Sequence, residues 1–198
     1  MPDETIRIRE AATAGGIEAA RALFAEYAAS LDWDLASSRL AEELADLPGP
    51  YAPPAGSLLL AYAGGLPVGV LGLQPVPEGS RVPGAGAERF AEIKRLYVRP
   101  ENRRRGIARA LMERAEVDAR ERGYAAVVLT TSTEMMPLAQ GLYEDLGYEA
   151  TAPYRDDLPF PGIRWLRKDL REAAGGGAAG AGPRRPVGPR DGPGACRE

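Results

Sequence analysis

Histidine is absent from this chain of 198 residues, and cysteine occurs only once. Without histidine the chain has no Ser-His-Asp or Cys-His catalytic machinery and no histidine-ligated metal site, so we expect no metal cofactor. The single cysteine, Cys196, has no partner for an internal disulfide. That usage is typical of a reducing cytoplasm. Any acid–base chemistry therefore has to rely on carboxylates, tyrosine, lysine, the lone thiol or water.

Long hydrophobic runs are also missing. None approaches the roughly 20 apolar residues that a membrane-spanning helix needs, so we expect no membrane segment. The acidic start, residues 1–4, lacks the pattern of a signal peptide. The net charge of -3 argues against nucleic acid as a partner. These features predict a cytoplasmic protein.

The composition divides the chain into one domain over residues 1–171 and a tail over residues 172–198. The tail is rich in Gly, Ala, Pro and Arg and has no periodicity, so we expect it to be disordered. Hydrophobic residues make up 44% of the chain, enough for a single core. Their spacing predicts strands over residues 5–9, 57–63, 67–76, 89–98, 125–130, 148–152 and 163–169, and helices over residues 14–30, 34–47, 105–122 and 136–146.

The order of these elements predicts the fold class. Residues 89–98, 105–122 and 125–130 form a strand, helix, strand unit, which is typical of a right-handed crossover between parallel strands. Gly64-Gly65 instead predicts a hairpin between antiparallel strands. We therefore expect an α/β domain of the α+β type, with a mixed, mostly antiparallel sheet of roughly six to seven strands flanked by helices.

The most informative stretch, residues 93–112, reads as a strand, an arginine-rich turn and the start of an amphipathic helix. Free N–H groups at a helix N-terminus hold anions. Gly106 lets the backbone approach a bulky anion, Ala108 keeps the first helical turn uncluttered, and the neighbouring arginines add positive charge. The stretch therefore indicates a pyrophosphate site. The alternative is a basic surface loop that leads into an ordinary helix.

Two motifs carry a resemblance to a known family. Residues 103–108 read Arg-Arg-Arg-Gly-Ile-Ala, and residues 142–148 read Leu-Tyr-Glu-Asp-Leu-Gly-Tyr. They resemble the Arg/Gln-x-x-Gly-x-Gly/Ala and Leu-Tyr-x-x-x-Gly-Phe/Tyr signatures of GNAT-family N-acetyltransferases. The resemblance implies a GNAT-like domain whose fourth and fifth strands splay apart. It also implies transfer of an acetyl group from acetyl-CoA to a primary amine of a small molecule or peptide, by direct attack in a ternary complex.

The resemblance further implies which residues bind the co-substrate. The amides from Arg104 through Arg109 would hold its pyrophosphate, and the fourth strand would hold its thioester and pantetheine arm. Ser132 would contact pantetheine, although Thr131 and Thr133 carry the same hydroxyl. The implied set is Leu96, Tyr97, Val98, Arg103, Arg104, Arg105, Gly106, Ile107, Ala108, Arg109 and Ser132.

Two residues are candidates for proton transfer. Tyr143 resembles the family tyrosine whose hydroxyl faces the CoA sulfur; alternatively it is only an aromatic core residue. Glu92 lies on the fourth strand, where some family members carry a general base. The alternatives are a surface ion pair with Lys94 or Arg95, or a water chain as the base. Strand alternation predicts that Glu92, Lys94, Leu96 and Val98 share one face, where Lys94 could bind a substrate carboxylate.

The acceptor stays open at this point. Residues that could line its site are Tyr27, Trp33, Tyr154, Asp156, Asp157 and Phe160. The oligomeric state is open as well, a homodimer included. Two other functions fit the same motifs: a non-catalytic acyl-CoA-binding regulatory module, and a transferase of a longer acyl group.

Overall fold

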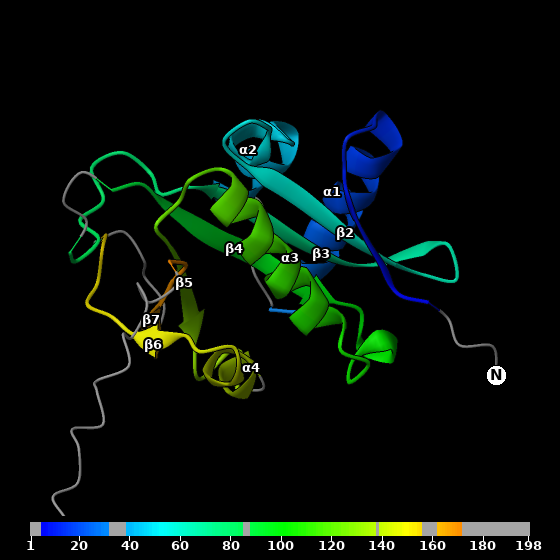
Figure 1. Cartoon of the computed structure of the whole chain (residues 1–198). Helices are drawn as coiled ribbons and strands as arrows, with labels where there is room; N and C mark the ends of the chain where they lie inside the picture. The colour runs from blue at the N-terminus through cyan, green and yellow to red at the C-terminus, as the bar shows by residue number, and fades with distance from the viewer. Residues whose placement is uncertain (1–4, 32–38, 85–87, 138, 156–161, 172–198) are drawn as a thin grey trace, which may run out of the picture.

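The structure is a computed structural model that describes residues 5–31, 39–84, 88–137, 139–155 and 162–171. Its strands form one seven-stranded sheet in the order β1-β2-β3-β4-β5-β7-β6 (Figure 1). Only the β4–β5 pair is parallel, and the other neighbours are antiparallel. The strands are β1 (Arg7–Glu10), β2 (Ser57–Ala63), β3 (Leu66–Pro75), β4 (Phe90–Val98), β5 (Ala126–Ser132), β6 (Glu149–Ala150) and β7 (Ile163–Asp169). The predicted mixed sheet is confirmed.

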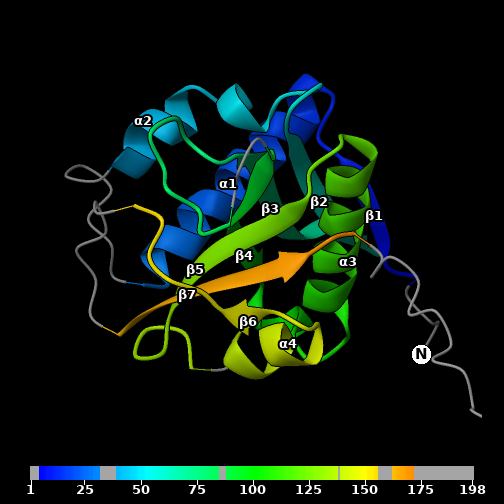
Figure 2. The same cartoon turned by 60° about the vertical axis from the view of Figure 1, so that its left-hand side comes forward.

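Helices cover both faces of this sheet (Figure 2). They are α1 (Ala14–Ala29), α2 (Arg39–Ala45), α3 (Ile107–Glu121) and α4 (Ala139–Asp145), with short 3-10 turns η1 (Gly49–Tyr51) and η2 (Pro100–Asn102). Helix α1 buries Leu23, Phe24 and Tyr27 in the core on one face. Helix α3 buries Leu111 and Met112 in the core on the other face, together with residues of α4. The helical spacing of these apolar residues is what fixes the face that each helix presents.

The boundary of α3 differs from the sequence-based expectation. Gly106 adopts a left-handed conformation with φ 77° and ψ 0°, so it caps the helix, which begins at Ile107 rather than at Arg105. The hairpin predicted at Gly64-Gly65 is present, with Ala63 paired to Leu66.

Parts of the prediction lie outside the described residues. These are the first turn of the predicted second helix, residues 34–38, and the whole tail, residues 172–198. Among the described residues, no helix has the length and apolar character that crossing a membrane requires.

Candidate active site

A gap opens in the middle of the sheet between β4 and β5. The two strands pair only from Phe90 opposite Ala126 to Glu92 opposite Val128. Strand β4 nevertheless continues to Val98, and β5 continues to Ser132. Beyond Glu92 the facing edges therefore part, as predicted for the fourth and fifth strands.

A β-bulge in β4 lies beside this gap. The register against β3 shifts between Val70 and Gly72, and Arg95 has a positive φ of 58°. An extra residue in one strand reverses the alternation of side chains beyond it. Lys94 and Arg95 both reach Glu43 of α2, whereas Leu96 packs into the core on the opposite face. The expectation that Lys94 and Leu96 share a face is wrong for this reason.

The bulge leaves two backbone amides of β4 directed at the gap. The N–H of Arg99 donates to the carbonyl of Val68 on β3. Amides point to alternate edges along a strand, so those of Leu96 and Val98 face away from β3 and toward β5. Tyr97 faces β3 instead, where its carbonyl oxygen lies 3.1 Å from a Cβ built on Gly69. The structure thus places Leu96 and Val98, but not Tyr97, on the open edge.

The turn after β4, which we call the cradle, has the backbone geometry of an anion-binding nest. Arg104 (φ 60°) and Gly106 (φ 77°) are both left-handed, and a left-handed residue followed by helical ones turns successive N–H groups inward. The first N–H groups of α3 have no partner within the helix, and Gly106 offers no side-chain cap. Arg103 Nε donates to the carbonyl of Val98 at 3.0 Å, which ties the turn to the end of β4.

The residues around the cradle leave its backbone uncovered and hold the start of α3 in place. A Cβ built on Gly106 would meet no atom within 4 Å. The side chains of Arg103, Arg104 and Arg105 belong to exposed residues, while Ile107 is buried and anchors the helix start. At the far side, Arg109 pairs with Asp145 of α4 at 3.1 Å. Positive charge, helix-start amides that have no partner within the helix, and a backbone without side-chain cover therefore coincide at the start of α3.

Tyr143 on α4 is buried, with 6% of its surface exposed, and packs edge-to-face on Tyr148 with ring centroids 6.0 Å apart. Burial raises the pKa of Tyr143 well above the ordinary value, and the nearby Tyr27 hydroxyl raises it further. Tyr27 belongs to α1, on the opposite face of the sheet from α4. The raised pKa means that Tyr143 keeps its hydroxyl proton at neutral pH.

Glu92 is fully buried, with 0% exposure, on the face covered by α1 and α2. Its carboxylate accepts hydrogen bonds from Gln74 Nε2 at 3.1 Å and from the Tyr154 hydroxyl at 2.9 Å. A terminal nitrogen of Arg155 forms an ion pair with Oε1 of Glu92 at 3.0 Å. Tyr154 is held in turn by an edge-to-face contact with Trp165 at 4.6 Å between ring centroids. The alternative of a surface ion pair with Lys94 or Arg95 is wrong, because the partner is Arg155.

At the end of β5, the hydroxyls of Ser132 and Thr131 have different surroundings. The Ser132 hydroxyl accepts a hydrogen bond from the N–H of Met135 at 3.2 Å and so closes the turn after the strand. Thr131 is 5% exposed, and its Oγ1 has no hydrogen-bond partner among the described residues. A buried hydroxyl without a partner is costly unless a ligand supplies one. Of the two hydroxyls, that of Thr131 is therefore the one that lacks a partner in the described structure.

The residues expected to line the acceptor site are only partly described. Tyr27 and Tyr154 lie on the α1 side of the sheet, whereas Trp33, Asp156, Asp157 and Phe160 lie outside the described residues. Sequence reasoning missed Glu43 and Arg155. Each is a single charged residue in a helix or loop with no motif around it, so the sequence offers no signal for either.

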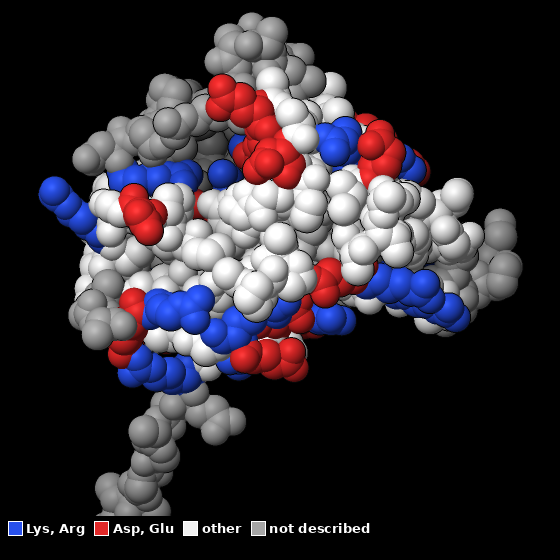
Figure 3. All heavy atoms as spheres, turned by 90° about the horizontal axis from the view of Figure 1, so that it is seen from above, with Lys and Arg blue, Asp and Glu red and all other residues white. Residues whose placement is uncertain are grey.

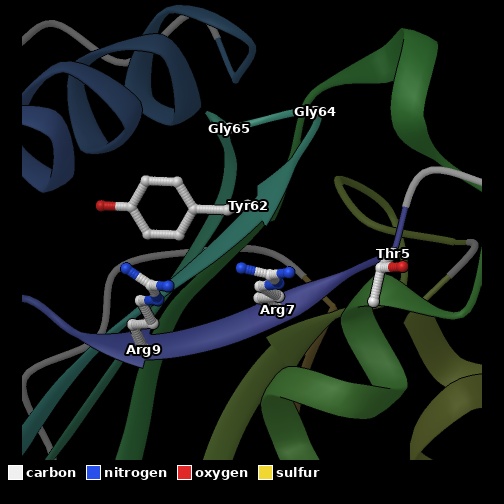
Figure 4. A pocket seen from close by; sticks show the side chains of 6 residues that line it. All are labelled: Thr5, Arg7, Arg9, Tyr62, Gly64 and Gly65. Atoms are coloured by element: carbon white, nitrogen blue, oxygen red, sulfur yellow. The ribbon is translucent and has the colours of Figure 1, made fainter.

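A separate hollow lies on the outer strands (Figure 4). It is lined by Thr5, Arg7, Arg9, Tyr62, Gly64 and Gly65. Arg7 and Arg9 project from β1 to the same side as Tyr62 of β2. Strands β2 and β3 separate β1 from β4 in the sheet, so this hollow does not belong to the gap.

Central parallel strands that part beside a basic turn at the start of a helix are what the resemblance to GNAT-family N-acetyltransferases led us to expect. The sequence model of the Acetyltransferase (GNAT) family matches residues 20–148, a range that includes the gap, the cradle and Tyr143. The chain belongs to this family.

Individual relatives and structures agree. An uncharacterized N-acetyltransferase of Schizosaccharomyces pombe is 30% identical over 149 residues, covering 75% of this chain and 85% of that protein. A probable N-acetyltransferase family 8 member of Mus musculus is 34% identical over 133 residues, which are 67% of this chain but only 55% of the mouse protein.

Two solved structures share the fold. A GNAT-family acetyltransferase of Staphylococcus aureus superposes with a TM-score of 0.64 at 20% identity, over 84% of this chain and 100% of that one. A putative acetyltransferase of Salmonella typhimurium, solved with acetyl-CoA, gives 0.61 at 18% identity, over 87% of this chain and 98% of that one.

Proposed function

We propose that this chain transfers an acetyl group from acetyl-CoA to a primary amine of a small molecule or peptide, by direct attack within a ternary complex. The observation that supports it most is that β4 and β5 part beyond Glu92, on the strand that leads into the left-handed turn at the start of α3. The cytoplasmic location inferred from cysteine usage belongs to the same proposal.

The residues present suit acetyl-CoA as a substrate. The amides of Ile107 and Ala108, with those of the preceding turn, bind its pyrophosphate, and the exposed arginines complement its remaining charge. Thr131 bonds an amide of the pantetheine arm with the Oγ1 that lacks a partner among the described residues. The amides of Leu96 and Val98 hold the thioester carbonyl, where a donor aimed at developing negative charge is worth about 3 kcal/mol.

Glu92 accepts the proton that the amine must lose. Its carboxylate is closed off from solvent, and the Tyr154 hydroxyl donates to it at 2.9 Å. The oxygen of that hydroxyl can accept a proton from the amine while its own proton passes to Glu92. Tyr154, which is itself only 1% exposed, relays the proton to the buried carboxylate in place of direct contact between Glu92 and the amine.

Tyr143 stabilises the departing sulfur. A thiol has an ordinary pKa of about 8.5, below that of a tyrosine at about 10, and burial raises the pKa of Tyr143 further. Full proton transfer to the thiolate is therefore unfavourable. Tyr143 acts as a neutral hydrogen-bond donor to the sulfur as the C–S bond breaks.

The test is steady-state thiol release with acetyl-CoA and a panel of amines, in the wild type, Tyr143→Phe and Tyr154→Phe. A positioned proton donor or acceptor contributes about 10²–10⁴-fold, so each variant should lose kcat by at least about 100-fold while calorimetry shows unchanged acetyl-CoA affinity. Propionyl-CoA and succinyl-CoA, run in competition, check the acyl group. Tight binding of acetyl-CoA with no amine acetylated would instead show an acyl-CoA-binding module.

A further inference from the structure

The side of the gap that faces α2 holds a cluster of charged side chains, which we call the Glu43 cluster: Glu43, Glu92, Lys94, Arg95 and Arg155. Its members come from α2, β4 and the segment after β6. They carry two negative and three positive charges, so the cluster has an excess of one positive charge. The β4 bulge creates it, since it brings Lys94 and Arg95 to one face.

Both carboxylates of the Glu43 cluster are already satisfied. Arg95 holds Glu43 in a two-pronged contact, with Nε at 3.1 Å and a terminal nitrogen at 2.8 Å, and the Tyr51 hydroxyl donates to the same carboxylate at 2.5 Å. Glu92 is held by Arg155 and by its two neutral donors. Paired in this way, each carboxylate neutralises one arginine.

Lys94 is the cation left over. Its ammonium lies 3.7 Å from Glu43, which is too far for a hydrogen bond, and no hydrogen bond from it to a described residue is found. Its side chain is 22% exposed, more than the 15% of Arg155 or the 12% of Arg95. Burial lowers the pKa of Lys94, which the nearby Glu43 only partly opposes. A half-buried ammonium that makes no hydrogen bond to a described residue favours an anionic ligand.

Building on the proposed function, we propose that Lys94 binds a carboxylate of the acceptor, so that the acceptor is a small amine that also carries a carboxylate, as a free amino acid does. Lys94 adjoins Glu92 on the same face of β4, so a carboxylate bound there holds a nearby amino group toward the proton acceptor. The positive excess also favours the neutral, nucleophilic form of the amine and disfavours polycations. On the face of the molecule seen in Figure 3, basic and acidic side chains are mixed.

The experiment compares matched acceptors: free amino acids, the corresponding amino acid amides, and a polyamine. A hydrogen-bonded charge pair is worth roughly tenfold or more, so wild-type kcat/KM should be at least about tenfold higher for an acid than for its amide. Lys94→Met should lose about that factor for the acid and change the amide by less than about threefold. Lys94→Arg should restore part of the preference for the acid. Arg9→Met, which removes an exposed cation of β1, is the matched control and should leave both values unchanged.

The contrary outcomes are distinct. Equal turnover of acid and amide by the wild type, preference for the polyamine, or an equal loss for both acceptors in Lys94→Met would overturn the carboxylate assignment and leave acetyl transfer standing. Binding of acetyl-CoA without transfer to any acceptor would overturn the proposed function, and this inference with it.

Discussion

Replacing Gly106 by alanine tests coenzyme A binding at the cradle separately from the stability of α3. Gly106 has a φ of 77°, and a residue with a Cβ in that conformation costs about 1–2 kcal/mol. Beyond its two chain neighbours the new Cβ would meet no described atom within 4 Å, so we expect backbone strain to dominate the cost in the free protein. For a chain of this size we expect Tm to fall by about 2–4 °C per kcal/mol.

The same methyl group occupies the space through which a pyrophosphate approaches the backbone. We therefore expect the Kd for coenzyme A, measured by calorimetry, to rise by at least about tenfold, or about 1.4 kcal/mol. A bulkier residue at position 106 should weaken binding by no less.

Gly123 provides the matched control at the other end of α3. It has a φ of 75°, and a Cβ built there also meets no atom within 4 Å. Gly123→Ala should thus lower Tm by a similar amount and leave the coenzyme A affinity unchanged. If both variants weaken coenzyme A equally, or neither does, the cradle is not at Gly106.

Two further predictions concern buried polar groups near the gap. Thr131→Val should raise the Kd for acetyl-CoA by about tenfold without lowering Tm, because it removes a hydroxyl that lacks a partner in the described structure. Burial alone would raise the pKa of Glu43, but hydrogen bonds and charges from Arg95, Lys94 and Tyr51 lower it overall. A lowered pKa contributes stability above the unfolded pKa of about 4.3 that is lost as pH falls through the folded value. In urea unfolding from neutral pH to about pH 3, Glu43→Gln should therefore lose less stability on acidification than the wild type; an identical pH dependence would contradict the assigned role of this ion pair.

The fold was predictable because its signals are local. A continuous apolar run marked β2 over the same residues that the structure gives, and Gly64-Gly65 marked the turn that follows it. The parallel β4–β5 pair followed from the strand, helix, strand order alone. The start of α3 was misplaced because the sequence does not reveal that Gly106 is left-handed.

The candidate site could be proposed from the sequence only where a single segment builds it. The cradle at residues 103–109 and Tyr143 belong to continuous motifs. The β4 bulge depends on the register with β3, so alternation placed Lys94 and Leu96 wrongly. Glu43 reaches Arg95 across 52 positions in sequence, and Arg155 reaches Glu92 across 63. Such pairings depend on tertiary packing, and no local sequence pattern predicts them.

A crystal structure of this chain with acetyl-CoA tests the central claim most directly. We expect pyrophosphate oxygens within about 2.7–3.2 Å of the amides of Ile107 and Ala108, and the thioester in the gap between Leu96 and the Tyr143 hydroxyl. Phosphates bound elsewhere, with the start of α3 uncontacted, would contradict the account.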